Sequence, residues 1–218
     1  MTDHFRTLAA PATGEFKDRG SKFIAYAWPV ETESEALLHI EALRKEHFKA
    51  AHHCFAWRFG TEGQRFRAND DGEPTGTAGK PILGQIDAFG LTNVVVVVVR
   101  YFGGTLLGAS GLINAYRETS AEALRNAQTV EKIIGQEFQF QAEYALLPDL
   151  MNALKKYNVS ILAEKYDEKA HLDISIRLSE TESTLLKIKA ALWRMQVDEI
   201  ATLDWPEGIL LENPETDS

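Results

Sequence analysis

Six consecutive valines at positions 94–99 constrain the fold of this chain more than any other feature. Valine is β-branched and stiff at χ1, so an unbroken run predicts a strand that is buried on both faces. The run leads directly into Arg100, Tyr101, Phe102, Gly103 and Gly104. A buried strand that ends in a charge, two aromatic rings and two glycines is expected to deliver these groups to a functional edge.

Residues 112–124 follow the glycines, and their apolar side chains have the spacing of a helix. Strand, glycine loop and helix therefore succeed one another. In that order the backbone amides of the loop could face an anion at the helix N-terminus.

Length and composition indicate a soluble globular protein of 218 residues, 44% hydrophobic and 25% charged. The valine run is too short to cross a bilayer, and the first residues show no secretory signal. Cys54 is the only cysteine, which excludes an intramolecular disulfide and a multi-thiolate zinc site. We therefore expect a cytoplasmic protein without membrane association.

The charge is distributed unevenly along the chain. Residues 1–134 hold 15 Lys+Arg and 16 Asp+Glu, whereas residues 135–218 hold 8 and 16. An acidic second half argues against a protein that coats nucleic acid over its whole surface. The nearly neutral first half leaves room for a local basic face.

The first part of the chain mixes strand and helix signals. A turn at 18–20 predicts a hairpin whose second strand includes 23–26, and Thr32 with Glu35 fits a capping box before a helix. Two strands at 53–59 and 65–68, a helix at 82–89, the valine strand and a third helix complete this part.

The second part is more regular. We predict strands at 136–144, 159–165, 171–178 and 197–203, with helices at 147–157 and 182–193. This βαββαβ order is the ferredoxin-like pattern. The predicted domains are 1–134 and 135–205, with a boundary near 131–135 and an acidic tail at 206–218.

The segment 69–81 is dense in turn-forming residues and carboxylates. It is not a nucleotide-binding P-loop, because Pro74 replaces the first glycine and Pro81 follows Lys80. One interpretation is a structured loop that caps the next helix, with Asp70 and Asp71 bound to backbone amides. The other is a binding loop, since long loops in compact domains are often functional.

Potential metal ligands occur in and near this loop. Adjacent strand residues point to opposite faces, so His52 and His53 cannot easily share one ion. At most one of them could join Asp70, Asp71 or Glu73. We assign His53, Asp70, Asp71 and Glu73 as loop residues that could hold a ligand or metal. We assign no particular metal, and the alternative is that one histidine is hydrogen-bonded inside the protein and the other lies at the surface.

No catalytic residue and no cofactor are predicted. Cys54 as a nucleophile needs a base and an electropositive setting, and the sequence demonstrates neither. The glycine loop at 103–111 also departs from the GxGxxG fingerprint of dinucleotide-binding proteins.

The residues around the glycine loop form a candidate phosphate or RNA site. The loop amides and nearby cations could hold a phosphate, and the aromatic rings could stack on a base. The alternative is that the glycines permit tight packing and the rings fill the core. The predicted binding residues are Arg58, Lys80, Arg100, Tyr101, Gly103, Gly104, Gly108 and Arg117.

Together these segments resemble the YigZ/IMPACT family. The blocks AHHCFAW, NDDGEPTGTAGKPIL and VVVVRYFGGTLLGASGLINAYR are similar to its signature blocks, and KDRGSKFIA fits its opening hairpin. The resemblance covers residues 17–125, and the two-domain length resembles the bacterial YigZ branch.

The resemblance implies an α+β fold of two domains. The first would be an α+β sandwich like those of ribosomal proteins and of domain four of elongation factor G. The second would be ferredoxin-like, similar to the last domain of that factor. Eukaryotic relatives restrain a translation-control kinase through an additional domain, so that partnership is not transferred.

For the bacterial branch the resemblance implies a role near translation with no established reaction. We therefore expect a non-enzymatic regulatory protein that binds RNA, the ribosome or a translation factor through its first domain. The alternative is a phosphate- or nucleotide-binding enzyme that uses the 103–111 and 70–80 loops.

Overall fold

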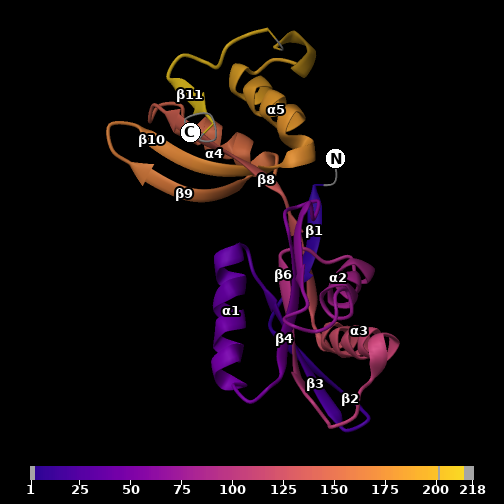
Figure 1. Cartoon of the computed structure of the whole chain (residues 1–218). Coiled ribbons are helices and arrows are strands. Elements are labelled where there is room, and N and C mark those ends of the chain that lie inside the picture. Colours follow the sequence, from indigo (N-terminus) through magenta and orange to yellow (C-terminus); the bar gives the residue numbers. More distant parts are fainter. Residues whose placement is uncertain (1–2, 201, 214–218) are drawn as a thin grey trace. The chain divides into compact units, whose positions relative to one another are not determined.

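The computed structural model describes residues 3–200 and 202–213, and it divides into two compact units (Figure 1). The N-terminal unit is His4–Lys132, and the C-terminal unit contains Asp3 and the residues from Ile133 onward. The division lies within the predicted interval 131–135. The prediction of two α+β domains is confirmed.

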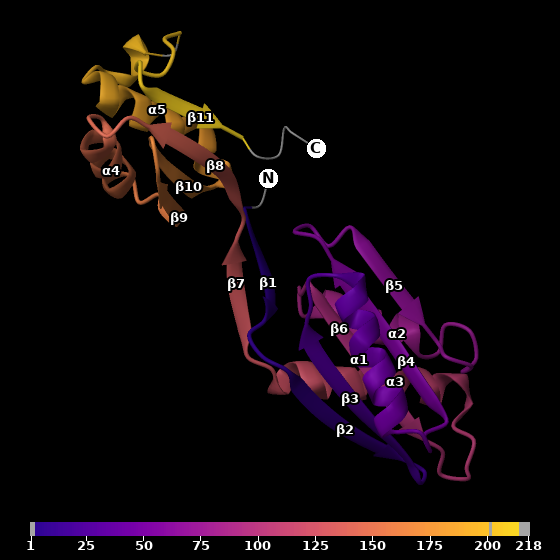
Figure 2. The ribbon, with the colours of Figure 1, turned by 90° about the vertical axis from the view of Figure 1, so that its left-hand side faces the viewer.

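A five-stranded antiparallel sheet is the centre of the N-terminal unit. Its strands, in spatial order, are β2 (Ala12–Asp18), β3 (Ser21–Pro29), β6 (Val94–Tyr101), β4 (His52–Phe59) and β5 (Arg65–Asn69). A separate two-stranded ribbon consists of β1 (His4–Leu8) and β7 (Thr129–Ile133), which run side by side in Figure 2.

Helices cover the two faces of this sheet unequally. Helix α1 (Glu33–Glu46) lies on one face, and α2 (Gly79–Ala88) and α3 (Gly108–Asn126) lie on the other (Figure 1). The hydroxyl of Thr32 accepts a hydrogen bond from the Glu35 amide at the start of α1, as predicted. The Glu35 carboxylate accepts from the amide of Glu31 instead of that of Thr32.

The valine strand is the central strand, with no exposed side chain between Val94 and Val99. Val94, Val96 and Val98 belong to the core under α2 and α3. The alternate valines, at 95, 97 and 99, belong to a second core under α1. The prediction of a strand buried on both faces is confirmed.

The C-terminal unit is a four-stranded antiparallel sheet in the order β11-β8-β10-β9. Its elements are β8 (Gly135–Ala142), α4 (Leu147–Lys156), β9 (Ser160–Tyr166), β10 (Ala170–Arg177), α5 (Thr181–Trp193) and β11 (Ile209–Glu212), with short 3-10 turns η1 (Leu178–Glu180) and η2 (Val197–Glu199). The element order is βαββαβ, and both helices contribute to one core with the sheet.

The predicted position of the last strand is wrong. The described part of 197–203 contains η2, which a capping box between Gln196 and Glu199 begins. The last strand is β11, inside the segment predicted as a tail. Gly208, with φ +90, turns the chain into this strand, and Ile209 enters the core. Residue 201 of the predicted strand and 214–218 of the predicted tail lie outside the described residues.

None of the described helices is both long and apolar enough to cross a membrane.

Candidate functional site

The motif residues converge in a buried polar cluster, which we define as Cys54, Glu73, Arg100 and Tyr116. Arg100 lies at the end of β6 and donates from Nη1 to Glu73 Oε1 at 2.6 Å. The hydroxyl of Tyr116, on α3, donates to the same oxygen at 2.8 Å. The side chains of Arg100 and Glu73 are only 6% and 3% exposed. The cluster therefore contains a buried ion pair that joins the 70–78 loop to the central strand.

The guanidinium of Arg100 also lies against two aromatic rings. Its centre is 5.4 Å from the Phe23 ring centroid and 5.6 Å from that of Phe102. Cation–π attraction at this range orients a ring over the charge. Arg100 thus contacts the exposed ring of Phe102, and its guanidinium forms an ion pair with the buried carboxylate of Glu73.

Cys54 is completely buried and faces the same cluster. Its sulfur lies 3.0 Å from the carbonyl oxygen of Asp70 and 3.3 Å from the hydroxyl of Tyr116. Burial raises the pKa of the Cys54 thiol and of the Tyr116 phenol, so both stay protonated at neutral pH. A protonated, inaccessible thiol is a poor nucleophile.

Asp70 precedes helix α2 in the chain and caps its N-terminus through hydrogen bonds to backbone amides. Its carboxylate accepts hydrogen bonds from the amides of Gly76, Ala78 and Gly79 at 2.8, 3.0 and 2.8 Å. Burial raises the pKa of Asp70, but these amide bonds outweigh it, and the net pKa is lowered. The bonds are those of the structured, helix-capping loop, one of the two interpretations that the sequence left open.

Asp71 and the two histidines make separate contacts. The Asp71 carboxylate accepts from the His53 amide at 2.7 Å and from Arg44 at 2.8 Å. His52 Nδ1 lies 2.8 Å from the Asp71 carbonyl oxygen, and its Nε2 lies 3.9 Å from Glu73 Oε1. Burial lowers the pKa of His53, which favours its neutral form.

Within the described ranges, no group of three or more His, Cys, Asp or Glu side chains could hold a metal ion.

The predicted cationic residues lie at different places in the N-terminal unit. Arg58 stands opposite Val94, at the far end of β4 from His52, so about 20 Å of strand separates it from the Arg100 end. Arg58 is bound to Asp87 at 2.6 Å and to the Gly63 carbonyl.

The side chains of Arg117 and Lys80 form no hydrogen bond or ion pair with the four residues of the buried cluster. Arg117 lies on the surface of α3 and is bound to Asn114 and Glu118. Lys80 is exposed in the first turn of α2 and forms no ion pair with a described residue. The structure therefore brings Arg100 and Glu73 together but not the four predicted cations.

The glycine loop is bound tightly to its neighbours. A Cβ at Gly103 would lie 1.9 Å from the Gly20 carbonyl carbon, so only glycine fits where these backbones meet. The amide of Gly103 donates to the hydroxyl of Ser21 at 3.1 Å. Gly104 and Gly108 have φ values of +85 and +73, which favour glycine.

A histidine that the sequence did not single out lies at the end of β6, where it contacts Tyr101. His47 follows α1, and its two ring nitrogens lie 2.8 Å from the hydroxyls of Tyr26 and Tyr101. The amide of Ala51 donates to the carbonyl of Arg100 at 2.9 Å. No local motif indicates these bonds, because the partners are distant in sequence.

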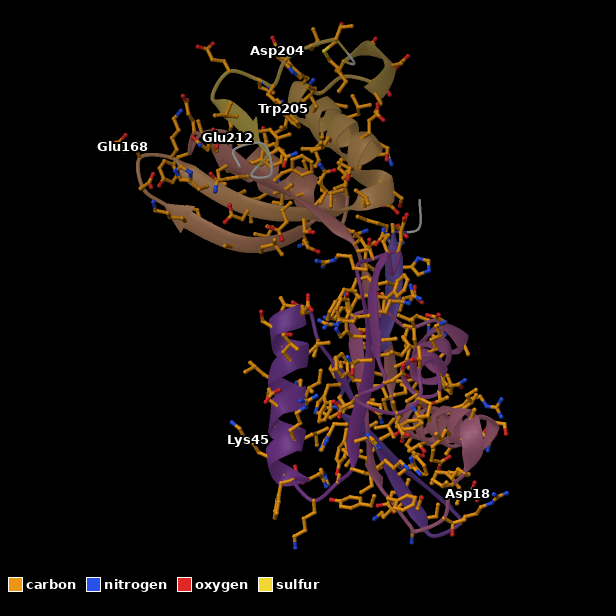
Figure 3. The ribbon with its side chains drawn as sticks, in the orientation of Figure 1. Asp18, Lys45, Glu168, Asp204, Trp205 and Glu212 are labelled. Carbon is orange, nitrogen blue, oxygen red and sulfur yellow. The ribbon has the colours of Figure 1, made fainter. Side chains whose placement is uncertain are left out.

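We name this surface the glycine end and define it as three segments, 17–22, 45–51 and 101–107. Figure 3 labels Asp18 and Lys45, which lie at this end of the unit. Residues 102–106 are exposed there, with Phe102 at 51% and Leu106 at 82%.

Two family models match the chain. The Impact N-terminal domain matches residues 19–124, and a domain of unknown function (DUF1949) matches residues 140–191. These matches fall in the N-terminal and C-terminal units, respectively.

Known proteins match over most of the chain. The IMPACT family member YvyE of Bacillus subtilis (strain 168) is 36% identical over 183 residues, 84% of either chain. The IMPACT family member YigZ of Escherichia coli (strain K12) is 38% identical over 160 residues, 72% of this chain and 78% of that protein.

Two solved structures are also similar. A crystal structure of a hypothetical protein is 31% identical, covers 97% of this chain and 98% of its own, and has a TM-score of 0.68. The two-domain translational regulator Yih1 is 30% identical, covers 56% of this chain and 47% of its own, and has a TM-score of 0.34. On the family models and the two bacterial relatives, the chain belongs to the IMPACT family.

Proposed function

We propose that the protein is a non-enzymatic regulator of translation that binds RNA, the ribosome or a translation factor through its N-terminal unit. The observation that carries this proposal is that the carboxylates and the thiol near the two loops are occupied in contacts inside the protein. Asp70, Asp71 and Glu73 are all bound internally, and the Cys54 thiol is buried. Such a cluster is suited to holding loops in place for recognition.

Family membership supports the link to translation, since the resemblance implies such a role for the bacterial branch. A cytoplasmic location belongs to the same proposal. The C-terminal unit, with its excess of acidic residues, is less suited to contact a phosphate backbone.

The test is co-sedimentation of the whole protein with purified ribosomes and their subunits at low and high salt. We expect association at low salt that weakens as salt rises, because each cation that neutralises a phosphate releases a counterion. Absence of association with ribosomes, subunits and RNA at low salt would contradict the proposal.

The second candidate is a phosphate- or nucleotide-binding enzyme that uses the 103–111 and 70–80 loops. It is favoured by the first turn of α3, which has exposed residues, no acidic side chain and no side-chain cap. Thermal unfolding with a nucleotide panel, with and without magnesium, distinguishes the two. A nucleotide at ~100 times its dissociation constant adds about 2.7 kcal/mol of apparent stability, whereas the first proposal predicts no shift.

A further inference from the structure

The glycine end is a connected surface although its three segments are distant in sequence. Gly103 packs on Gly20 and binds Ser21, which joins the 101–107 segment to the β2–β3 hairpin. His47 and Ala51 join the 45–51 segment to the end of β6. The surface is therefore largely preorganised, which lowers the entropic cost of binding.

Positive charge predominates on this surface. The three segments hold five lysines or arginines and two acidic residues. Lys17, Arg19 and Lys45 are exposed and form no ion pair or hydrogen bond through their side chains with a described residue. In the loop at 70–73, two of the three carboxylates are paired with a cation, Glu73 with Arg100 and Asp71 with Arg44.

Aromatic and backbone groups accompany these charges. Phe48 is 74% exposed, and Lys49 lies 5.6 Å from its ring centroid. Phe102 is held over Arg100, as described above. Phe102 is followed in the chain by the exposed residues 103–106 and by the first turn of α3, which has no side-chain cap. Cations, amides and isolated rings are the groups that contact a single-stranded nucleic acid.

We propose that the glycine end binds RNA, with Lys17, Arg19, Lys45 and Lys49 on phosphates and Phe102 stacked on a base. This inference rests on the proposed function and narrows it to one partner class and one surface. RNA is favoured over a protein factor because lysine is depleted in protein interfaces. Three exposed large apolar side chains, Phe48, Phe102 and Leu106, accompany the five lysines and arginines of this surface.

The charge part of the proposal is tested by filter binding of labelled polyuridylate RNA to the whole protein over a salt series. The test variant is Lys17→Ala with Lys49→Ala. Its matched control is Lys155→Ala with Lys187→Ala, two exposed lysines of the C-terminal unit without ion pairs to described residues. Each lost phosphate contact should lower the salt slope of log K by about 0.7, and the control should leave it unchanged.

The stacking part is tested by Phe102→Ala against Phe66→Ala. Both rings lie against an arginine, and they are 51% and 57% exposed, but Phe66 is on β5. Loss of one base–aromatic contact should weaken RNA binding about tenfold for Phe102→Ala and leave Phe66→Ala near wild type. Unchanged unfolding midpoints of the variants show that the fold is retained.

The outcomes separate this inference from the function on which it rests. Equal RNA binding by test and control variants overturns the inference. Ribosome association that persists without polyuridylate binding, and that the lysine variant leaves intact, places the contact outside the lysines of the glycine end and also overturns the inference, while the regulatory function stands. Failure of every association overturns both.

Discussion

At the scale of single residues, the buried ion pair should matter most. Glu73→Gln removes the charge that compensates Arg100 and leaves a buried guanidinium without an anion. Breaking such a pair costs about 3–5 kcal/mol of unfolding free energy. Urea unfolding measures it. Glu33→Gln is the control, because its 3.0 Å pair with Arg67 is half exposed and should cost under about 1 kcal/mol. Equal losses in the two variants would contradict the assignment.

Cys54 should be inert in the folded protein. Because burial raises the pKa of its thiol, the native state keeps the proton at pH values where the unfolded thiol, with a pKa of about 8.5, ionises. The contribution of this thiol to the free energy of unfolding is therefore fully present below about pH 8.5. It decreases by about 1.4 kcal/mol per pH unit above that pH. A thiol reagent at pH 8 should label Cys54 only after denaturation. Rapid labelling of the native protein is the contrary result.

At the scale of elements, the glycine loop depends on one close backbone contact. Gly103→Ala places a Cβ against Gly20 and should separate the loop from the hairpin, which weakens both stability and RNA binding. Gly84→Ala is the control within a helix, where the new Cβ has no atom within 4 Å other than those of its chain neighbours and its own helix backbone. It should stabilise the protein by roughly 0.5–1 kcal/mol. Thermal unfolding and filter binding report both effects.

The sequence predicted elements well where the local pattern was strong. Six valines allow little besides a buried strand, and the order βαββαβ followed from helical and strand spacing. Strand β11 was missed because it has only four residues and its role depends on pairing with β8. The sequence also placed Arg100 at the strand end but could not show its partner, since Glu73 is 27 residues away and only the fold joins them.

At the scale of the whole molecule, the two units have separate cores, and β11 belongs to only one of them. Removing residues 206–218 deletes Ile209 from the C-terminal core and leaves one side of β8 unpaired. We expect the C-terminal unit to unfold and the N-terminal unit to stay folded. Amide hydrogen exchange tests this, with protection lost in β8 and retained in the valine strand. Retained protection in β8 would show that β11 is dispensable.

The valine strand has one further consequence, for strand alignment during folding. Its alternate side chains fill two different cores, yet all six are identical. A slip by one residue exchanges the two faces of a strand, and here it would still place valine in both cores. The run itself therefore carries little information about its own register. That information lies at its end, where Arg100 must reach Glu73 and Tyr101 must reach His47. The buried ion pair is thus also a contact that distinguishes the native strand register from a register shifted by one residue.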